Sequence, residues 1–385
     1  MIVKYLFSSP KGDIPAGPDE LASPFKITPS KEHPYLSLRD YFDAIRDFIL
    51  RDCARPLVAL LRDLLHTNLN PDDIYELLIR TEKHGALYHI ASIEVISGNQ
   101  PVKLSVSTAV SERGKALLSN EFEVLESLYG KFHLPYLPRP YSLQEVPCDA
   151  GGREESLLML LAEWFEDYHE WHLRGEEEDG VSKVCVWDNK NGYWIASEKE
   201  RNEIFRQIAK ILTLYYNTKD FSQIYPWHHG AGDFIIKREK GQIHTRLTTV
   251  RKYEEIMRLV SDDSVNPFVA ITYFFLNLTI KIRLDRSDGV GTMVWADEFS
   301  VEAAIEGFFE ALCLMEMENR FHLGSVDDLL ALFKAFDPED LQKIFDSLLR
   351  LYQHEDADEE DFQTINKNLV THVRQLYKAI QDFRK

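Results

Sequence analysis

The chain has 385 residues and a formal net charge of −19, with 44 Lys and Arg against 63 Asp and Glu. A charge of this sign and size repels phosphate backbones and anionic lipid, which argues against nucleic acid and membrane surfaces as partners. Hydrophobic residues make up 44% of the chain and aromatic residues 12%. That is ample for packed cores and excludes a largely disordered chain.

The cysteines give no sign of a disulfide framework or a zinc site. Cys53, Cys148, Cys185 and Cys313 lie far apart, and no two have CxxC spacing, so we expect reduced thiols and a cytoplasmic protein. The N-terminal apolar run is too short for a signal peptide. The most apolar stretch, residues 268–280, is shorter than a bilayer span and predicts a buried core helix.

The N-terminal part of the chain changes character twice. Residues 1–35 are rich in Pro, Gly and Ser and predict an irregular arm. Residues 36–69 carry apolar side chains at helical spacing and predict two amphipathic helices. Three β-rich runs follow, at residues 74–79, 87–96 and 102–106, and the last two are joined by the turn-forming Ser97-Gly98-Asn99.

From residue 115 on, predicted helices and strands first alternate, and the later part of the chain is mainly helical. We expect a helix over 115–128, a strand over 141–146 and a buried strand over 157–165. A small hairpin is predicted over 181–195, a strong amphipathic helix over 198–216, and a second hairpin over 234–249. Everything after about residue 265 has the pattern of helix.

Strands and helices therefore segregate along the chain, which predicts an α+β fold with two lobes. We assign residues 1–70 to an N-terminal arm and helices, and 71–165 to a small lobe with an antiparallel sheet and one helix. Residues 166–385 form a mostly helical lobe with the hairpin 234–249 embedded in it.

This order of elements, with the segment YPWHHGAGDFIIK (Tyr225–Lys237), resembles the protein kinase-like fold in its aminoglycoside phosphotransferase and choline kinase branch. That family carries HGDxHxGN, followed by an apolar strand, a hairpin and a metal-binding Asp. The resemblance places Asp233 at the metal-binding Asn, where an Asp could also hold Mg²⁺. It places His228 at the catalytic Asp, and Thr248 and Thr249 where the second metal-binding acid belongs.

The same resemblance implies site residues in the small lobe. Ser105 stands at the phosphate-binding Lys, and Lys103 shares its face of the strand and could replace it. Glu121 falls at the helix Glu that pairs with this Lys. Glu163 and Phe165 lie at the hinge between lobes, where backbone groups could meet an adenine.

With both acids changed, the resemblance implies a non-catalytic protein that binds a nucleotide, another small molecule or nothing. One alternative is an active phosphotransferase for a small-molecule hydroxyl, with His228 as base, Asp233 holding Mg²⁺ and Lys103 on the phosphates of ATP. Another is a metal-dependent enzyme that uses His228, His229 and Asp233. The cofactor accordingly stays open between none and ATP with Mg²⁺, and no protein partner is indicated.

Some residues have an ordinary structural interpretation. His169 and His172 have the spacing of a solvated helix face, and the charges from Arg283 to Asp288 are typical of ion pairs on a helix surface. Arg251 could hold a carboxylate or a phosphate near the second hairpin. The aromatic residues Tyr225, Trp227 and Phe234 could line a pocket or seal the base of the lobe.

Overall fold

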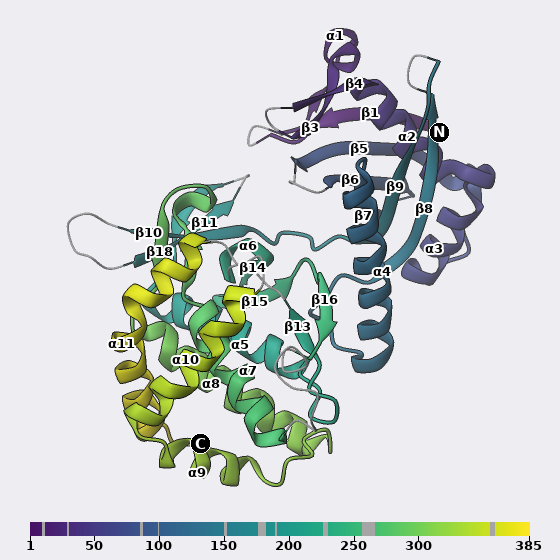
Figure 1. Cartoon of the computed structure of the whole chain (residues 1–385). Helices are drawn as coiled ribbons and strands as arrows, with labels where there is room; N and C mark the ends of the chain where they lie inside the picture. The colour runs from purple at the N-terminus through teal and green to yellow at the C-terminus, as the bar shows by residue number, and fades with distance from the viewer. Residues whose placement is uncertain are drawn as a thin grey trace. The chain divides into compact units, whose positions relative to one another are not determined.

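A computed structural model describes residues 1–9, 12–28, 31–84, 88–98, 100–149, 152–175, 182–188, 191–225, 230–255, 266–354 and 359–385. The chain divides into two compact units (Figure 1). The first consists of Met1–Glu166 with Asn189–Asn191, and the second of Asp167–Asp188 with Gly192–Lys385. The first unit is built on a large sheet and the second is mostly helical, which confirms the predicted α+β class.

The sheet of the first unit has the strand order β2-β1-β5-β6-β7-β9-β8. The strands are β1 (Ile2–Phe7), β2 (Ile14–Pro15), β5 (Ile74–His84), β6 (His89–Ser97), β7 (Gln100–Ala109), β8 (Pro140–Asp149) and β9 (Glu154–Glu163). The predicted strands after residue 70 are all present and pair antiparallel. The sheet as a whole is mixed, because β1 runs parallel to β5.

The N-terminal residues differ from the predicted arm. β1 joins the sheet beside β5, and a hairpin of β3 (Pro24–Thr28) and β4 (Lys31–Ser37) follows the short helix α1 (Pro18–Ala22). The ring of Tyr5 stacks on Phe42 at 4.8 Å, and its hydroxyl donates to Asp43. Burial of the apolar side chains of β1 thus favours a strand here, although the residues around it are typical of turns.

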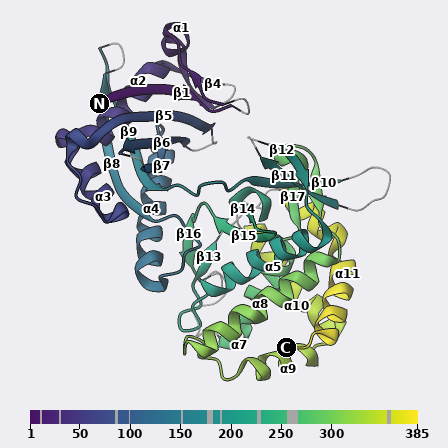
Figure 2. The same ribbon diagram turned by 180° about the vertical axis from the view of Figure 1, so that it is seen from behind.

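Helices cover both faces of this sheet (Figures 1 and 2). The predicted pair α2 (Leu38–Leu50) and α3 (Arg55–Leu65) packs on one face, and α4 (Glu112–Phe132) packs on the other. β9 shows the alternation directly, since Met159 points to the α2 face and Leu160 to the α4 face. Both faces are therefore buried, which explains the nearly continuous apolar sequence of β9.

The second unit combines short strands with a helical core. Its elements are β10 (Glu170–Gly175), β11 (Ser182–Asp188), β12 (Gly192–Ile195), α5 (Glu198–Leu214), β13 (Gln223–Tyr225), α6 (Gly230–Asp233), β14 (Phe234–Glu239), β15 (Gln242–Leu247), β16 (Lys252–Glu254), α7 (Pro267–Lys281), β17 (Leu284–Arg286), β18 (Met293–Trp295), α8 (Phe299–Met317), α9 (Val326–Ala335), α10 (Pro338–His354) and α11 (Glu359–Asp382). The amphipathic helix α5 and the hairpin β14–β15 confirm two of the predicted elements. Within the described ranges, no helix has both the length and the apolar character needed to cross a membrane.

The crossing of α5 and α8 is very close because it is made at a glycine. A Cβ atom on Gly307 of α8 would meet backbone atoms of Arg206 and Lys210 on α5, and would lie 3.0 Å from the Cβ of Ala209. Beside the crossing, Glu310 of α8 binds both Arg206 and Lys210. Only glycine allows the two backbones to approach this closely.

Gly307→Ala is therefore expected to lower the free energy of unfolding by about 1–3 kcal/mol, because the helices must separate to admit the methyl group. Chemical denaturation followed by circular dichroism measures the change. Gly130→Ala in α4 is the matched control, since a Cβ atom there meets nothing within 4 Å. The control should be neutral or stabilising by up to about 1 kcal/mol through helix propensity. Equal losses in the two variants would contradict a close crossing.

Candidate functional site

Asp233 is the last residue of α6 and lies directly before β14, and its carboxylate is buried. Only 7% of the side chain is exposed. Its two carboxylate oxygens each accept a hydrogen bond at 3.2 Å from Arg251, one from Nη1 and one from Nη2. This bidentate contact joins the residue before β14 to a residue just after β15, and it gives the buried negative charge a guanidinium partner.

Thr248 also binds at Asp233, but through the backbone. Its amide and its hydroxyl both donate to the carbonyl oxygen of Asp233 at 2.9 Å. The hydroxyl therefore helps to close the base of the hairpin. Both of these contacts go to the backbone carbonyl of Asp233 and not to its carboxylate.

The other proposed ligands of the segment, His228 and His229, lie outside the described residues, as does Trp227. Among the residues that the structure does describe, no group of three His, Cys, Asp or Glu side chains is arranged to hold a metal ion. The roles of His228 as a base and of both histidines as metal ligands stay predictions.

In the first unit, Lys103 lies on β7 and pairs across β6 with an acid of β5. Its Nζ is 3.6 Å from Glu82 Oε1 of β5 and lies 4.2 Å from the centre of the Trp164 ring. Glu82 also accepts a hydrogen bond from Ser92. The ammonium group thus has both an anionic and an aromatic partner, which offset its positive charge.

The remaining predicted residues of this unit come from α4, β7 and the end of β9. Glu121 of α4 is buried and accepts a hydrogen bond from Tyr88. Ser105 donates to the carbonyl oxygens of Ala162 and Glu163, and so ties β7 to the end of β9. Glu163 itself accepts from the Arg139 amide at 3.2 Å. Phe165 follows β9 and is half-buried.

The predicted site residues thus fall into two groups. Lys103, Glu121, Glu163 and Phe165 belong to the first unit, and Asp233 to the second. Within the first unit, Lys103, Glu121 and Glu163 come from β7, α4 and β9, and the partners described for them are Glu82, Tyr88 and the Arg139 amide. A joint site with Asp233 stays a prediction.

His172 was predicted on a solvated helix face, and this is wrong. The residue lies on strand β10 and is 6% exposed. Its Nδ1 is 3.3 Å from Asp285, and the same carboxylate accepts from the Leu173 amide at 2.6 Å. His169 is also not on a helix: its backbone pairs with that of Ile236 in β14 through two hydrogen bonds. The pairing partners are distant in sequence, so local spacing could not reveal them.

The charged run from Arg283 to Asp288 is also not a helix surface. Arg283 and Asp285 are 2% and 1% exposed, on and beside the short strand β17. Arg283 donates to the Ala296 carbonyl, Gln375 and Nδ1 of His372. Strand β17 has only three residues and follows α7 (Pro267–Lys281) closely, so no local alternation in the sequence distinguishes it from a continued helix.

The hydrogen bonds of His372 require a single neutral tautomer. Nδ1 accepts from Arg283 at 2.9 Å, and Nε2 lies 3.3 Å from the hydroxyl of Thr279, which donates its own hydrogen to the Leu276 carbonyl. Nε2 must therefore carry the hydrogen. Complete burial, together with the charge of Arg283, holds the pKa of His372 well below its usual value.

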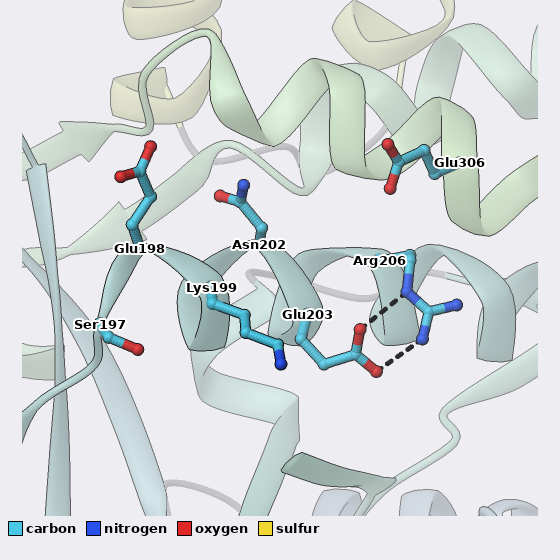
Figure 3. Close-up of a pocket in the computed structure, with 7 residues that line it drawn as sticks. All are labelled: Ser197, Glu198, Lys199, Asn202, Glu203, Arg206 and Glu306. Atoms are coloured by element: carbon cyan, nitrogen blue, oxygen red, sulfur yellow. Dashed lines mark hydrogen bonds and ion pairs between the residues drawn. The ribbon is translucent and has the colours of Figure 1, made fainter. Parts of the chain in front are cut away.

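A separate depression lies along α5 beside α8 (Figure 3). It is lined by polar and charged side chains: Ser197, Glu198, Lys199, Asn202, Glu203, Arg206 and Glu306. Two of these satisfy each other, because Arg206 donates to Glu203 through both Nε and Nη2. None of the described residues that line the depression is apolar, so we do not assign it a ligand.

Arg251→Met is expected to lower the free energy of unfolding by on the order of 3 kcal/mol, because it removes the guanidinium that binds both oxygens of the buried Asp233 carboxylate. The double variant Arg251→Met, Asp233→Asn should recover most of that loss, because it removes the buried negative charge as well. Denaturant titration of the single and double variants measures the coupling.

Arg238→Met is the matched control for this cycle. Arg238 lies on the same hairpin and pairs with Glu200, but about half of its side chain is exposed, so the change should have little effect. If the losses of Arg251→Met and Asp233→Asn simply add, the pair is not coupled and the described contact is contradicted.

The burial of His372 predicts a decline of stability in acid. In the unfolded chain this histidine takes up a proton as the pH falls below about 6.5, whereas in the folded chain it stays neutral. The unfolded state then binds more protons, so the free energy of unfolding falls with decreasing pH by up to about 1.4 kcal/mol per unit. His372→Gln can keep both hydrogen bonds and should flatten this decline. Identical slopes in the two proteins would contradict the assignment.

Comparison with known proteins gives little further information. No family model matches the chain, and no curated protein matches it. Among solved structures, the chain is similar to a crystal structure described as "Putative fructosamine-3-kinase" from Haemophilus somnus 129PT. The sequences are 9% identical, the match covers 84% of this chain and 95% of the other, and the TM-score is 0.25. A similarity this low supports no argument about fold or activity.

Proposed function

We propose that this chain is a kinase-like binding or regulatory protein that does not transfer phosphate. The proposal rests on the resemblance of its element order and of the Tyr225–Lys237 segment to the aminoglycoside phosphotransferase and choline kinase branch. The observation that carries it is the bidentate contact between Asp233 and Arg251.

The contact matters because Mg²⁺ is held by oxygen ligands that can donate electron density freely. Both oxygens of the Asp233 carboxylate accept hydrogen bonds from a guanidinium that keeps its charge at any physiological pH. A magnesium ion at Asp233 would have to displace that guanidinium or lie close to it, and two cations repel each other. The arrangement therefore supports a carboxylate that stabilises the fold in place of one that binds a metal.

Lys103 supports the same proposal from the first unit. In a working kinase the lysine of this strand binds phosphate and pairs with the acid of the helix. Here Lys103 pairs with Glu82, and Glu121 of the helix accepts from Tyr88. A ligand that lacks a triphosphate would not require either group to leave its partner. We therefore favour a small molecule or a weakly held nucleotide as the ligand.

Calorimetric titration with ATP, with and without Mg²⁺, tests the proposal. We expect magnesium to add no affinity, and we expect no phosphorylation of small hydroxyl compounds. An increase in ATP affinity of about ten-fold or more on adding Mg²⁺, lost in Asp233→Asn and kept in Arg238→Met, would overturn the proposal. That result would favour the active phosphotransferase.

A further inference from the structure

A pocket of about 370 Å³ lies in the first unit, between the α2–α3 segment and the adjoining parts of β8 and β9. Its apolar wall includes Phe48, Leu57, Leu60 and Leu161. Leu57 and Leu161 belong to the core on the α2 face of the sheet, which is the face opposite α4. The volume is within the range of small-molecule sites.

Arg51 lines this pocket and has an incomplete set of partners. Its Nη2 donates to Ser142 at 3.1 Å, and the guanidinium lies 5.1 Å from the centre of the Phe48 ring. Its Nη1 is buried, and among the described residues it has no hydrogen-bond partner. Burial lowers the pKa of Arg51, and the nearby Asp52 opposes this only in part. A buried donor of a charged group without a partner is unfavourable, and a bound anion could supply that partner.

The backbone that carries Arg51 is strained. The three residues after it, Asp52, Cys53 and Ala54, have φ values of 50°, 57° and 59°. Left-handed backbone is disfavoured for residues that have a Cβ atom, and three in succession are unusual. This turn leads directly into Pro56 and Leu57, which also line the pocket. Strain of this kind is typical of segments that hold a ligand-binding side chain in position.

A second cation lies across the pocket. The guanidinium of Arg139 is 5.1 Å from the ring of Tyr129 and 5.6 Å from that of Tyr141, and it is only loosely paired with Asp63, at 3.7 Å. Burial raises the pKa of Tyr141 to about 12, so its hydroxyl stays protonated and able to donate. The described lining of the pocket thus includes two guanidinium groups and the Tyr141 hydroxyl but no acid, while the carboxylates of Asp52, Asp63 and Glu163 lie near these groups.

We propose that this pocket binds a small amphipathic carboxylate, with the apolar body against Leu57, Leu60 and Leu161 and the carboxylate on Arg51. The chain carries a net charge of −19, so a pocket with two arginines stands out as a local exception. The carboxylate matches the planar guanidinium, and the apolar wall favours a ligand larger than a bare inorganic anion. This inference is independent of the proposed function, because Asp233 belongs to the other unit.

The test uses the full chain and three probes: 3-phenylpropionate, its neutral amide and inorganic phosphate. Titration calorimetry should give a dissociation constant for 3-phenylpropionate below about 1 mM. The amide should bind at least about ten-fold more weakly because it lacks the charge, and phosphate should also bind more weakly because it leaves the apolar wall uncovered.

Variants locate the binding site. Arg51→Met should lose at least about ten-fold in affinity for 3-phenylpropionate, and Leu60→Trp should abolish binding by filling the pocket. Arg153→Met is the matched control, because Arg153 is an exposed arginine of the same unit that lies over the Tyr35 ring, away from the pocket. It should bind as the unchanged protein does. If Arg51→Met does not fold, as judged by circular dichroism, Arg139→Met replaces it, with a loss in the same direction.

Several outcomes would overturn the proposal. One is the absence of binding of 3-phenylpropionate to the unchanged protein. Equal affinity for the acid and its amide, or for the unchanged protein and Leu60→Trp, would also exclude the site. Phosphate binding as tightly as 3-phenylpropionate would mean that the arginines form a simple anion site without a role for the apolar wall.

Discussion

The ion pair between Asp233 and Arg251 is the contact on which our account depends. It spans the β14–β15 hairpin at its base, where the backbone carbonyl of Asp233 is also held by Thr248. One contact therefore meets two needs: it fixes the ends of the hairpin, and it gives a buried carboxylate a partner. The same contact occupies the oxygens that a metal ion would require, so stability at this position and magnesium binding compete for one side chain.

The sequence predicts most of the regular structure correctly, because that structure follows local patterns. The helices α2, α4 and α5 have clear apolar stripes, and the hairpin β14–β15 turns at Lys240 and Gly241, both with positive φ. These features depend on neighbours a few residues away, which a single sequence displays. For Arg251 the sequence leaves a carboxylate and a phosphate open, and the structure gives it the carboxylate of Asp233.

What could not be predicted depends on contacts between distant residues. Strand β1 exists because it can pair in parallel with β5, about seventy residues later. His172 and Asp285 are 113 residues apart, and Arg283 and His372 are 89 apart. Each looks like a surface residue in its own segment, and only the partner makes burial tolerable. The site residues named from the sequence therefore stay a prediction, and the partners of Lys103 and Glu121, namely Glu82 and Tyr88, were not predicted.

The structure also shows how weakly total charge describes a local environment. A chain with a large excess of acids still holds Arg283 in its interior and lines a pocket with Arg51 and Arg139. In each case the guanidinium contacts aromatic rings as well as oxygen acceptors, which suits a weakly hydrated, planar cation. Local potentials in this protein thus depend on which charges are buried and paired.

The most direct measurement of the central claim is a crystal structure grown with Mn²⁺ and a non-hydrolysable ATP analogue, with the manganese located by anomalous scattering. Our account predicts that Arg251 still binds both oxygens of Asp233 and that no manganese peak lies at that carboxylate. A manganese ion coordinated by Asp233 and the phosphates, with Arg251 displaced, would contradict it.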